Sequence, residues 1–447
     1  MKKLKWIMRL AIMLMAAIAM LSLGSCSNPS GSDTTGNHGS TDTTDTNDDT
    51  TDDEDDGEGE NDDEDDDEPE TPEEVFFEGK GILGDPFIID SLEALLQMRE
   101  LVNEGDIEIL NPYRGAHYKQ TVSIDMDNME WESIGTSTNT FLGVYDGGNY
   151  TISNLKATGS DKGLFGYVGD PGGNSSGAVI MNVRLSNLDI DAVDSAGGIT
   201  GTLHDGTIKN CRVSGGTITA NGEYCGGIAA YIGMESLVEN CYVSAITIKA
   251  PSGSSSAGGL AGFNFGGTIR NCYTTADVSG KYYSGGITGY NYGLIEHCYA
   301  AGDVTNTDTT SGSGLAGGLA GYMTAGTVQN CIAFNKNVRA GGTAGRVAGE
   351  KIGGTLRHNY ARYGMYLTVG NTLYTPGYTG DPIIDAASKD GLCGTNSAWN
   401  SIISGQDFLE YEENWYEEAW DFTTIWKMGA QLPILQSFGS DVQDPRL

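Results

Sequence analysis

Five cysteines recur at regular intervals in the sequence, and aligned thiols are the side chains of this chain best suited to chemistry. Each follows an apolar residue, a variable residue and Asn or His; they are Cys211, Cys241, Cys272, Cys298 and Cys331. Such thiols can bind a metal, form disulfides or pack as small apolar groups. Metal ligands must converge on a point, and no C-x-x-C pair occurs. We therefore expect an inward column of free thiols, with no metal and no cofactor. A disulfide between neighbouring repeats would strain its dihedral angle.

Aromatic residues follow the cysteine column by one position. If the thiols point inward, the alternation of side chains along a strand sends these rings outward. Tyrosine combines a flat apolar ring with a polar hydroxyl, which suits ligand binding. The sequence therefore predicts a candidate surface for a glycan or protein ligand at Tyr242, Tyr273, Tyr299 and Tyr360. The alternative is that these rings stack on one another, shielding the face or lying beneath a loop.

Residues arranged for catalysis are scarce in this sequence. Neither H-E-x-x-H nor the phosphate loop G-x-x-x-x-G-K-[ST] is present. The pairs Asp125 with Asp127 and Asp189 with Asp191 have a spacing that acid–base chemistry could use, but carboxylates two residues apart are common in strands. We predict no catalytic residue. A polysaccharide lyase or hydrolase on the same scaffold remains the alternative.

These columns belong to a repeat that runs from about residue 135. Boxes of the form G-[LIRV]-x-[GA] begin at Gly163, Gly198, Gly227, Gly259, Gly286, Gly318 and Gly345. The pattern that carries the cysteines recurs eight times, at intervals averaging about 29 residues. No copy has a helical period, and the interval is short for a propeller blade. The sequence predicts an all-β fold, a right-handed parallel β-helix (β-solenoid) of about eight rungs over residues 135–362, with glycines at the corners allowing positive φ and close rung approach.

The boxes resemble the GLUG motif, which is named for its G-L-x-G signature. That motif occurs in bacterial surface proteins and in N-terminal regions of some IgA-directed metallopeptidases. The resemblance covers roughly residues 76–436 and implies a β-solenoid in a surface context, but no particular reaction. Ala230 departs from the signature where Gly is expected, as does Arg346 where Leu is expected.

Two further columns precede the cysteines. Asn tolerates the left-handed conformation and can hydrogen-bond to its neighbour one rung away, so we expect a corner ladder at Asn182, Asn210, Asn240, Asn271, His297, Asn330 and His358. The preceding position alternates in charge, which predicts exposed cross-rung pairs among Lys209, Glu239, Arg270, Glu296, Gln329 and Arg357.

The N-terminal residues have the character of a targeting segment. Residues 1–9 are basic, residues 10–23 are apolar except for Ser22, and Leu23-Gly24-Ser25-Cys26 resembles the lipobox of bacterial lipoproteins. An apolar run of this length suits a signal peptide rather than a membrane span. We expect a signal peptide over 1–26 and lipidation of Cys26. By resemblance to known sorting rules, Ser27 favours the outer membrane, with the protein exposed at the cell surface.

Three segments flank the repeats. Residues 27–74 contain 22 acidic residues, no Lys or Arg, and no apolar residue other than Gly and Pro, which predicts a disordered acidic linker. Residues 75–134 are expected to form an N-terminal cap with a helix over 90–104 that begins at Asp90 or Ser91. Residues 363–447 are expected to form a C-terminal cap that is rich in Trp: Trp399, Trp415, Trp420 and Trp426.

The charge balance narrows the choice of partners. The chain has 25 Lys and Arg against 61 Asp and Glu, a net charge of −36, which disfavours nucleic acid. We expect a monomer held at the membrane by its lipid anchor. The sequence best fits an adhesin-like surface protein that binds a glycan or a host or matrix protein. A structural surface lipoprotein is a further alternative.

Overall fold

A computed structural model describes residues 77–104, 111–172, 177–252, 255–308, 313–362, 365–374, 419–439 and 441–445. The chain divides into two compact units, Met1–Glu70 and Thr71–Leu447, and the described residues belong to the second. The expected signal peptide, Cys26, the acidic linker, Trp399 and Trp415 lie outside the described residues.

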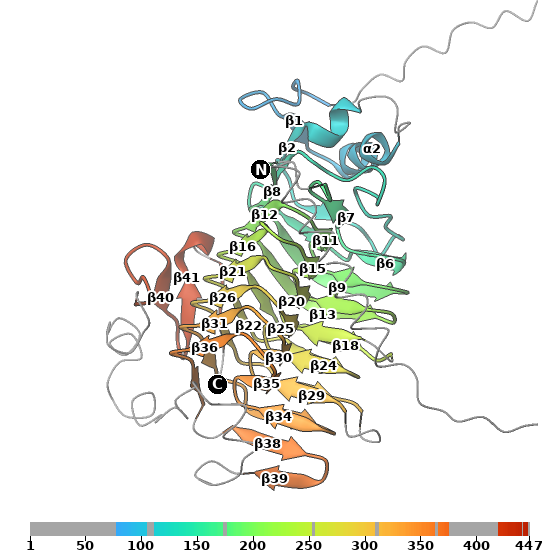
Figure 1. The fold of residues 1–447 in the computed structure, drawn as a ribbon. Helices are drawn as coiled ribbons and strands as arrows, with labels where there is room; N and C mark the ends of the chain where they lie inside the picture. The colour runs from blue at the N-terminus through green and yellow to red at the C-terminus, as the bar shows by residue number, and fades with distance from the viewer. Residues whose placement is uncertain are drawn as a thin grey trace, which may run out of the picture. The chain divides into compact units, whose positions relative to one another are not determined.

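The second unit is a β-solenoid in which each complete rung contributes strands to four parallel sheets, here numbered 1 to 4 in chain order (Figure 1). Sheet 1 contains β1 (Phe87–Ile89), β2 (His117–Gln120), β4 (Val144–Asp146), β8 (Ala178–Met181), β12 (Gly206–Lys209), β16 (Leu237–Glu239), β21 (Thr268–Arg270), β26 (Leu294–Glu296), β31 (Thr327–Gln329) and β36 (Thr355–Arg357).

Sheet 2 has two rows of strands joined by the long strands β9 (Arg184–Ala192) and β13 (Arg212–Ala220). The first row adds β3 (Ile124–Asp125), β5 (Thr151–Ser153), β17 (Tyr242–Ser244), β22 (Tyr273–Thr274), β27 (Tyr299–Ala300), β32 (Ile332–Ala333) and β37 (Tyr360–Ala361). The second row adds β6 (Lys156–Gly159), β18 (Thr247–Ala250), β23 (Asp277–Gly280), β28 (Val304–Asn306), β33 (Asn337–Ala340), β38 (Tyr366–Val369) and β39 (Thr372–Tyr374), the last of which is antiparallel.

Sheets 3 and 4 complete each rung. Sheet 3 contains β10 (Ala196–Gly197), β14 (Tyr224–Gly226), β19 (Ser256–Gly258), β24 (Tyr283–Gly285), β29 (Leu315–Gly317) and β34 (Thr343–Gly345). Sheet 4 contains β7 (Phe165–Val168), β11 (Thr200–Leu203), β15 (Ala229–Ile232), β20 (Ala261–Asn264), β25 (Thr288–Asn291), β30 (Ala320–Met323) and β35 (Ala348–Lys351). The predicted β-solenoid is confirmed. It is longer than residues 135–362, because β1, β2 and β38 already belong to its sheets.

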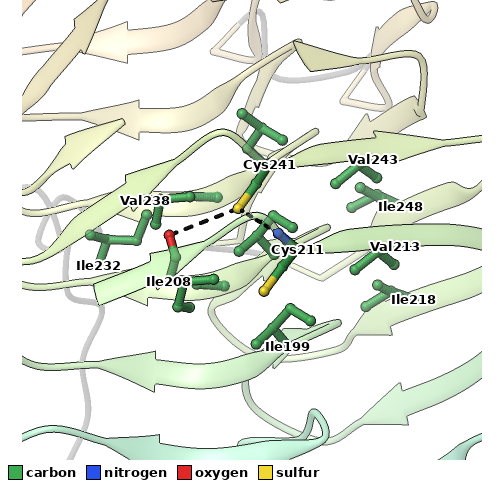
Figure 2. Packing of buried hydrophobic residues seen from close by; sticks show 14 of the residues in the cluster. Ile199, Ile208, Cys211, Val213, Ile218, Ile232, Val238, Cys241, Val243 and Ile248 are labelled. Atoms are coloured by element: carbon green, nitrogen blue, oxygen red, sulfur yellow. Dashed lines mark hydrogen bonds between the residues drawn. The ribbon is translucent and has the colours of Figure 1, made fainter. Parts of the chain in front are cut away.

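The cysteine column lies inside the solenoid, as predicted. Figure 2 shows Cys211 and Cys241 among buried aliphatic side chains, and the six cysteines of the described chain are buried and free. The backbone N–H of Cys211 donates to Sγ of Cys241, one rung away, at 3.3 Å, and three further pairs repeat this contact. At the end of the column, the N–H of Cys331 donates instead to Oδ1 of the buried Asn359. Each sulfur therefore satisfies a backbone group of its neighbour as well as filling the core.

The residues before the cysteines form the sharp corner between sheets 1 and 2. All seven, from Asn182 to His358, have φ between 47° and 57°. The left-handed conformation expected of this column is confirmed. Beside it, Arg270 pairs with Glu239 at 2.8 Å, and Gln329 donates to Glu296 at 3.1 Å, in keeping with the expected cross-rung ladder.

The box glycines serve close rung approach, and within the described chain none of them has positive φ. A Cβ on Gly286 would lie 2.1 Å from the carbonyl oxygen of Gly318 in the next rung, and 2.6 Å from Cβ of Ala300. The residue after this glycine points into the core, where Ile199, Ile228, Leu260, Ile287, Leu319 and Val347 form a fully buried column.

Arg346 does not replace the Leu of its box, contrary to the prediction. Strand pairing places Gly345 opposite Gly317 and Ala348 opposite Ala320, so Arg346 is opposite Gly318 and Val347 occupies the core position. Sheets 3 and 4 end with this rung in the described chain. A side chain is therefore tolerated here, because no further described rung approaches it.

The N-terminal helix is confirmed as α2 (Leu92–Asn103), with Ser91 as its N-cap accepting a bond from the Ala94 N–H. Its buried residues Ala94, Leu95, Met98 and Val102 join the solenoid core. A 3₁₀ turn, η1 (Pro112–Gly115), leads from this region into β2.

The predicted C-terminal end cap is wrong in its placement. The C-terminal segment (residues 419–439 and 441–445) contains the hairpin β40 (Trp426–Met428) and β41 (Pro433–Leu435) and the turn η3 (Gln436–Phe438). It packs along the first row of sheet 2 rather than over the end of the stack (Figure 1). Its Trp420 and Trp426 are buried against side chains of that row.

Gly286→Ala tests the close approach of the rungs. The added Cβ meets backbone on the next rung, so we expect a loss of about 1–3 kcal/mol in the free energy of unfolding, measured by chemical denaturation. Gly115→Ala is the matched control, because its Cβ would meet no atom within 4 Å. Equal effects of the two substitutions would contradict the packing role.

Candidate functional site

The tyrosine column points away from the core but is not exposed. Tyr242, Tyr273 and Tyr299 are 2%, 1% and 0% exposed. Their rings stack in register, with centroids 4.8 and 4.9 Å apart and nearly parallel planes. Tyr360 is half-buried and packs against the same cluster. The prediction of a free binding surface at these residues is therefore wrong, and the alternative, a column beneath another segment, describes what the structure shows.

The C-terminal segment covers this column through specific contacts. The Tyr299 hydroxyl donates to the Pro433 carbonyl at 2.6 Å, and the Tyr273 hydroxyl donates to Oε1 of Gln443 at 3.0 Å. Phe438 packs edge-on against Tyr242, with centroids 4.6 Å apart. Burial raises the pKa of these tyrosines, so their hydroxyls stay protonated, and those of Tyr273 and Tyr299 act as donors.

In the rungs that precede Tyr242, the same column contains two arginines. Arg184 and Arg212 lie opposite each other on β9 and β13, and both approach Oδ2 of Asp441, at 3.1 and 3.5 Å. The C-terminal segment thus combines apolar burial with one partly buried ion-pair network.

The two candidate aspartate pairs do not form a site. Asp125 accepts bonds from the Asp127 N–H and from Asn154, which hold the pKa of its carboxyl below the usual range. Asp189 and Asp191 are exposed on β9, where Asn221 donates to Asp191. Neither pair converges with other chemical groups.

A different face of the solenoid carries most of the remaining aromatic residues. Strand pairing in sheet 4 aligns one outward column: Tyr167, Thr202, Tyr231, Phe263, Tyr290, Tyr322 and Glu350. Strand pairing in sheet 3 aligns a second column, if the register of the first rungs is continued by one residue. This column contains Asp161, Ser195, Tyr224, Ser256, Tyr283, Leu315 and Thr343. We define the aromatic face as Tyr224, Tyr231, Phe263, Tyr283, Tyr290 and Tyr322.

Rings from the two columns contact one another. Phe263 stacks on Tyr290 with centroids 4.6 Å apart, and Tyr283 stacks on Tyr322 at 4.5 Å. Tyr224 of sheet 3 lies 5.3 Å from Phe263 of sheet 4. The glycine that ends most of the boxes permits this meeting, since a Cβ on Gly262 would lie 2.8 Å from Cβ of Tyr224. The motif therefore draws two rows of rings together.

At one end of the aromatic face the sheet 4 column is interrupted. Thr202 stands between Tyr167 and Tyr231, and its small side chain leaves a hollow of about 590 Å³. We call this the acidic hollow; it is lined by Asp161, Tyr167, Asp194, Ser195, Thr202, His204, Glu223, Tyr224 and Tyr231.

The charges of the hollow influence one another. The Tyr167 hydroxyl donates to Oδ2 of Asp161 at 2.7 Å. Partial burial, together with the charges of Asp161 and Asp194, raises the pKa of the Glu223 carboxyl above its ordinary value. Burial lowers the pKa of His204, partly opposed by Asp170. The lining thus concentrates three carboxylates beside an imidazole that favours its neutral form.

Two more properties belong to the residues that the structure describes. Among them, no three His, Cys, Asp or Glu side chains lie close enough together to hold a metal ion. None of the helices in this part of the chain is both long and apolar enough to cross a membrane.

Sequence reasoning missed the aromatic face, although a signal for it was present. The residue directly after the last position of each box is aromatic at Tyr167, Tyr231, Phe263, Tyr290 and Tyr322. The exceptions are Thr202, where the hollow lies, and Glu350, at the last rung of sheet 4.

These features define a β-solenoid, and two of its repeats carry the GLUG motif. A model of the GLUG motif matches residues 253–279 and 280–305. Halomucin of Haloquadratum walsbyi is 30% identical over 194 residues, which cover 42% of this chain and 2% of halomucin. Immunoglobulin A1 protease of Streptococcus pneumoniae is 26% identical over 291 residues, covering 62% of this chain and 13% of the protease.

Two more similarities extend this set. A protein of Evansella cellulosilytica named as a Gly-rich membrane protein is 28% identical over 152 residues, covering 31% of this chain and 16% of that protein. The solved structure of an immunoglobulin A1 protease-like protein from Bacteroides ovatus superposes with a TM-score of 0.52 at 22% identity, covering 81% of this chain and 96% of that one. This likeness shows the shared fold. The chain spans only a small part of the relatives matched by sequence.

Trp426→Ala tests the cover on the tyrosine column. Removing this buried ring should weaken the docking of the C-terminal segment by about 3–5 kcal/mol, and hydrogen exchange in β17, β22 and β27 should accelerate. Lys427→Ala, an exposed neighbour on the same strand, is the control and should leave exchange unchanged. Protection that persists in the Trp426 variant would show that the segment does not shield the column.

Proposed function

We propose that this protein is a lipid-anchored, adhesin-like surface protein that binds a glycan on its aromatic face. The observation that carries the proposal is the arrangement of six rings in two columns, outside the solenoid core and in mutual contact. Five of the six, all but Phe263, are tyrosines that remain half-buried and so keep part of each ring accessible. GLUG repeats and a relative named as a membrane protein agree with a surface or secreted repeat protein.

A glycan suits this face for physical reasons. Sugar rings have apolar C–H faces edged by hydroxyls, and tyrosines provide flat apolar area with a polar group at the rim. Tyr and Phe lose little side-chain freedom on binding, which favours a rigid contact surface. The carboxylates of the acidic hollow add acceptors for sugar hydroxyls at one end of the face.

The second candidate is a polysaccharide lyase or hydrolase, and the acidic hollow is the observation that favours it. Glycoside hydrolysis commonly uses two carboxyl groups, one of them with a raised pKa that suits a proton donor, as found for Glu223. One relative is named as a protease, an enzyme, but the matching region is 13% of that protein. The chain also lacks H-E-x-x-H. We therefore place binding before catalysis.

Cys26→Ala tests the anchor, which rests on the lipobox resemblance. Without the thiol there is no acceptor for the lipid, so the variant should accumulate as a larger precursor that takes up no labelled fatty acid in cells. The same labelling in wild type and variant would refute lipidation at Cys26.

Tyr322→Ala tests the binding face. With one of two stacked rings removed, we expect retention on the best ligand of a glycan array to fall about five- to tenfold, because each aromatic contact contributes about 0.5–1.5 kcal/mol or more. Tyr150→Ala, an exposed tyrosine outside the aromatic face, is the matched control.

Two outcomes would count against glycan binding on this face. Full retention by the Tyr322 variant would refute the face as the site. Exclusive retention on matrix proteins would replace the glycan by a protein ligand. Release of new reducing or unsaturated ends from the array ligand would favour the enzyme.

A further inference from the structure

We propose that the acidic hollow binds the protonated amino group of an amino sugar, so that the glycan of this protein is a cationic one. The proposal rests on the proposed function, because Tyr224 and Tyr231 belong to both the hollow and the aromatic face. It adds the chemical class of the ligand.

Three carboxylates are held on successive rungs of the hollow. The Lys162 N–H donates to the Ser195 carbonyl at 2.9 Å, and the Glu223 N–H donates to the Asp194 carbonyl at 3.0 Å, which fixes the turns that carry them. No Lys or Arg lines the hollow, and none forms an ion pair with Asp161, Asp194 or Glu223 in the described part of the chain. Asp194 and Glu223 are exposed and Asp161 is half-buried, so a cationic ligand can reach all three and pair with them.

Two buried residues direct unpartnered hydroxyls into the hollow, which points to a ligand independently of the acids. Ser195 and Thr202 are 5% and 8% exposed, and both line the hollow. Register places Ser195 between Asp161 and Tyr224, and places Thr202 between two tyrosines, so both side chains face the hollow. Neither hydroxyl bonds to another described residue. The residues are buried but their hydroxyls open into the hollow, where sugar hydroxyls can bond to them.

The rings of the hollow fit the same ligand. Tyr167, Tyr224 and Tyr231 surround it, and aromatic faces attract a cation as well as the apolar side of a sugar ring. The volume of about 590 Å³ lies within the range of small-molecule sites and exceeds the need of a single Lys side chain. Because the rings continue along the aromatic face, the structure favours a chain of sugars over a flexible cationic peptide.

The experiment compares two oligosaccharides of equal length by calorimetry on the full chain. One is a glucosamine tetramer, studied below the pKa of its amines, and the other is the N-acetylglucosamine tetramer, which is neutral. We expect the amino form to bind about tenfold more tightly, with a salt-dependent affinity. The double variant Asp194→Asn, Glu223→Gln should remove that preference.

Two further variants separate the hollow from general electrostatic attraction. Asp189→Asn removes an exposed carboxylate from another face, and it should preserve the preference. Thr202→Tyr continues the aromatic column, so it should fill the hollow without disturbing the fold, and it should abolish the preference. Unchanged melting temperatures would confirm that the variants are folded.

Other outcomes overturn the proposal in distinguishable ways. If both tetramers bind equally and Tyr290→Ala abolishes that binding, recognition of the amino group is refuted, while glycan binding on the aromatic face is retained. If Asp189→Asn removes the preference for the amino form as fully as the double variant does, that preference comes from the overall charge of the protein. Oligolysine that binds as tightly, with the same response to Thr202→Tyr, would replace the sugar by a basic peptide. If neither tetramer nor any arrayed glycan binds, the proposed function fails together with this inference.

Discussion

The structure depends on how closely each rung approaches the next where sheet 3 turns into sheet 4. At Gly286 the neighbouring rung's carbonyl oxygen occupies the space that any Cβ would need. This contact sets the spacing at the corner, and the parallel hydrogen bonds of the four sheets then carry the same spacing around the rung. The aliphatic residue that follows the glycine is driven into the core by the same turn. A two-residue requirement, glycine then an aliphatic side chain, thus accounts for most of the motif.

Strict rung-to-rung register turns repeated positions into continuous columns with different physical roles. Thiols satisfy backbone N–H groups within the core, Asn and His provide the left-handed corner, and aromatic residues after the boxes form a face of contacting rings outside the core. A single substitution in such a column changes the shape of the solenoid only at that rung. At Thr202 the loss of a ring opens a hollow, whereas at Arg346 the end of the stack lets a side chain replace glycine.

Local patterns in the sequence were sufficient to predict the solenoid, the inward thiols, the Asn corner and the N-terminal helix. Each of these depends on neighbours within one or two rungs. The burial of Tyr273 could not be predicted in this way, because its hydroxyl donates a hydrogen bond to Gln443, which lies 170 residues later in the chain. The acidic hollow was missed for another reason. Asp161, Asp194 and Glu223 do not share one repeat position, so only the folded turns bring them together.

The C-terminal segment changes how the repeat array responds to force. In a simple solenoid each rung contacts only its neighbours, so the stack can unravel from an end one rung at a time. Here one segment reaches from Arg184 on β9 to the cluster that contains Tyr360 on β37. The rungs in between contact the same C-terminal segment and must separate from it together. Tension along the chain would therefore meet one large mechanical barrier rather than a series of small ones.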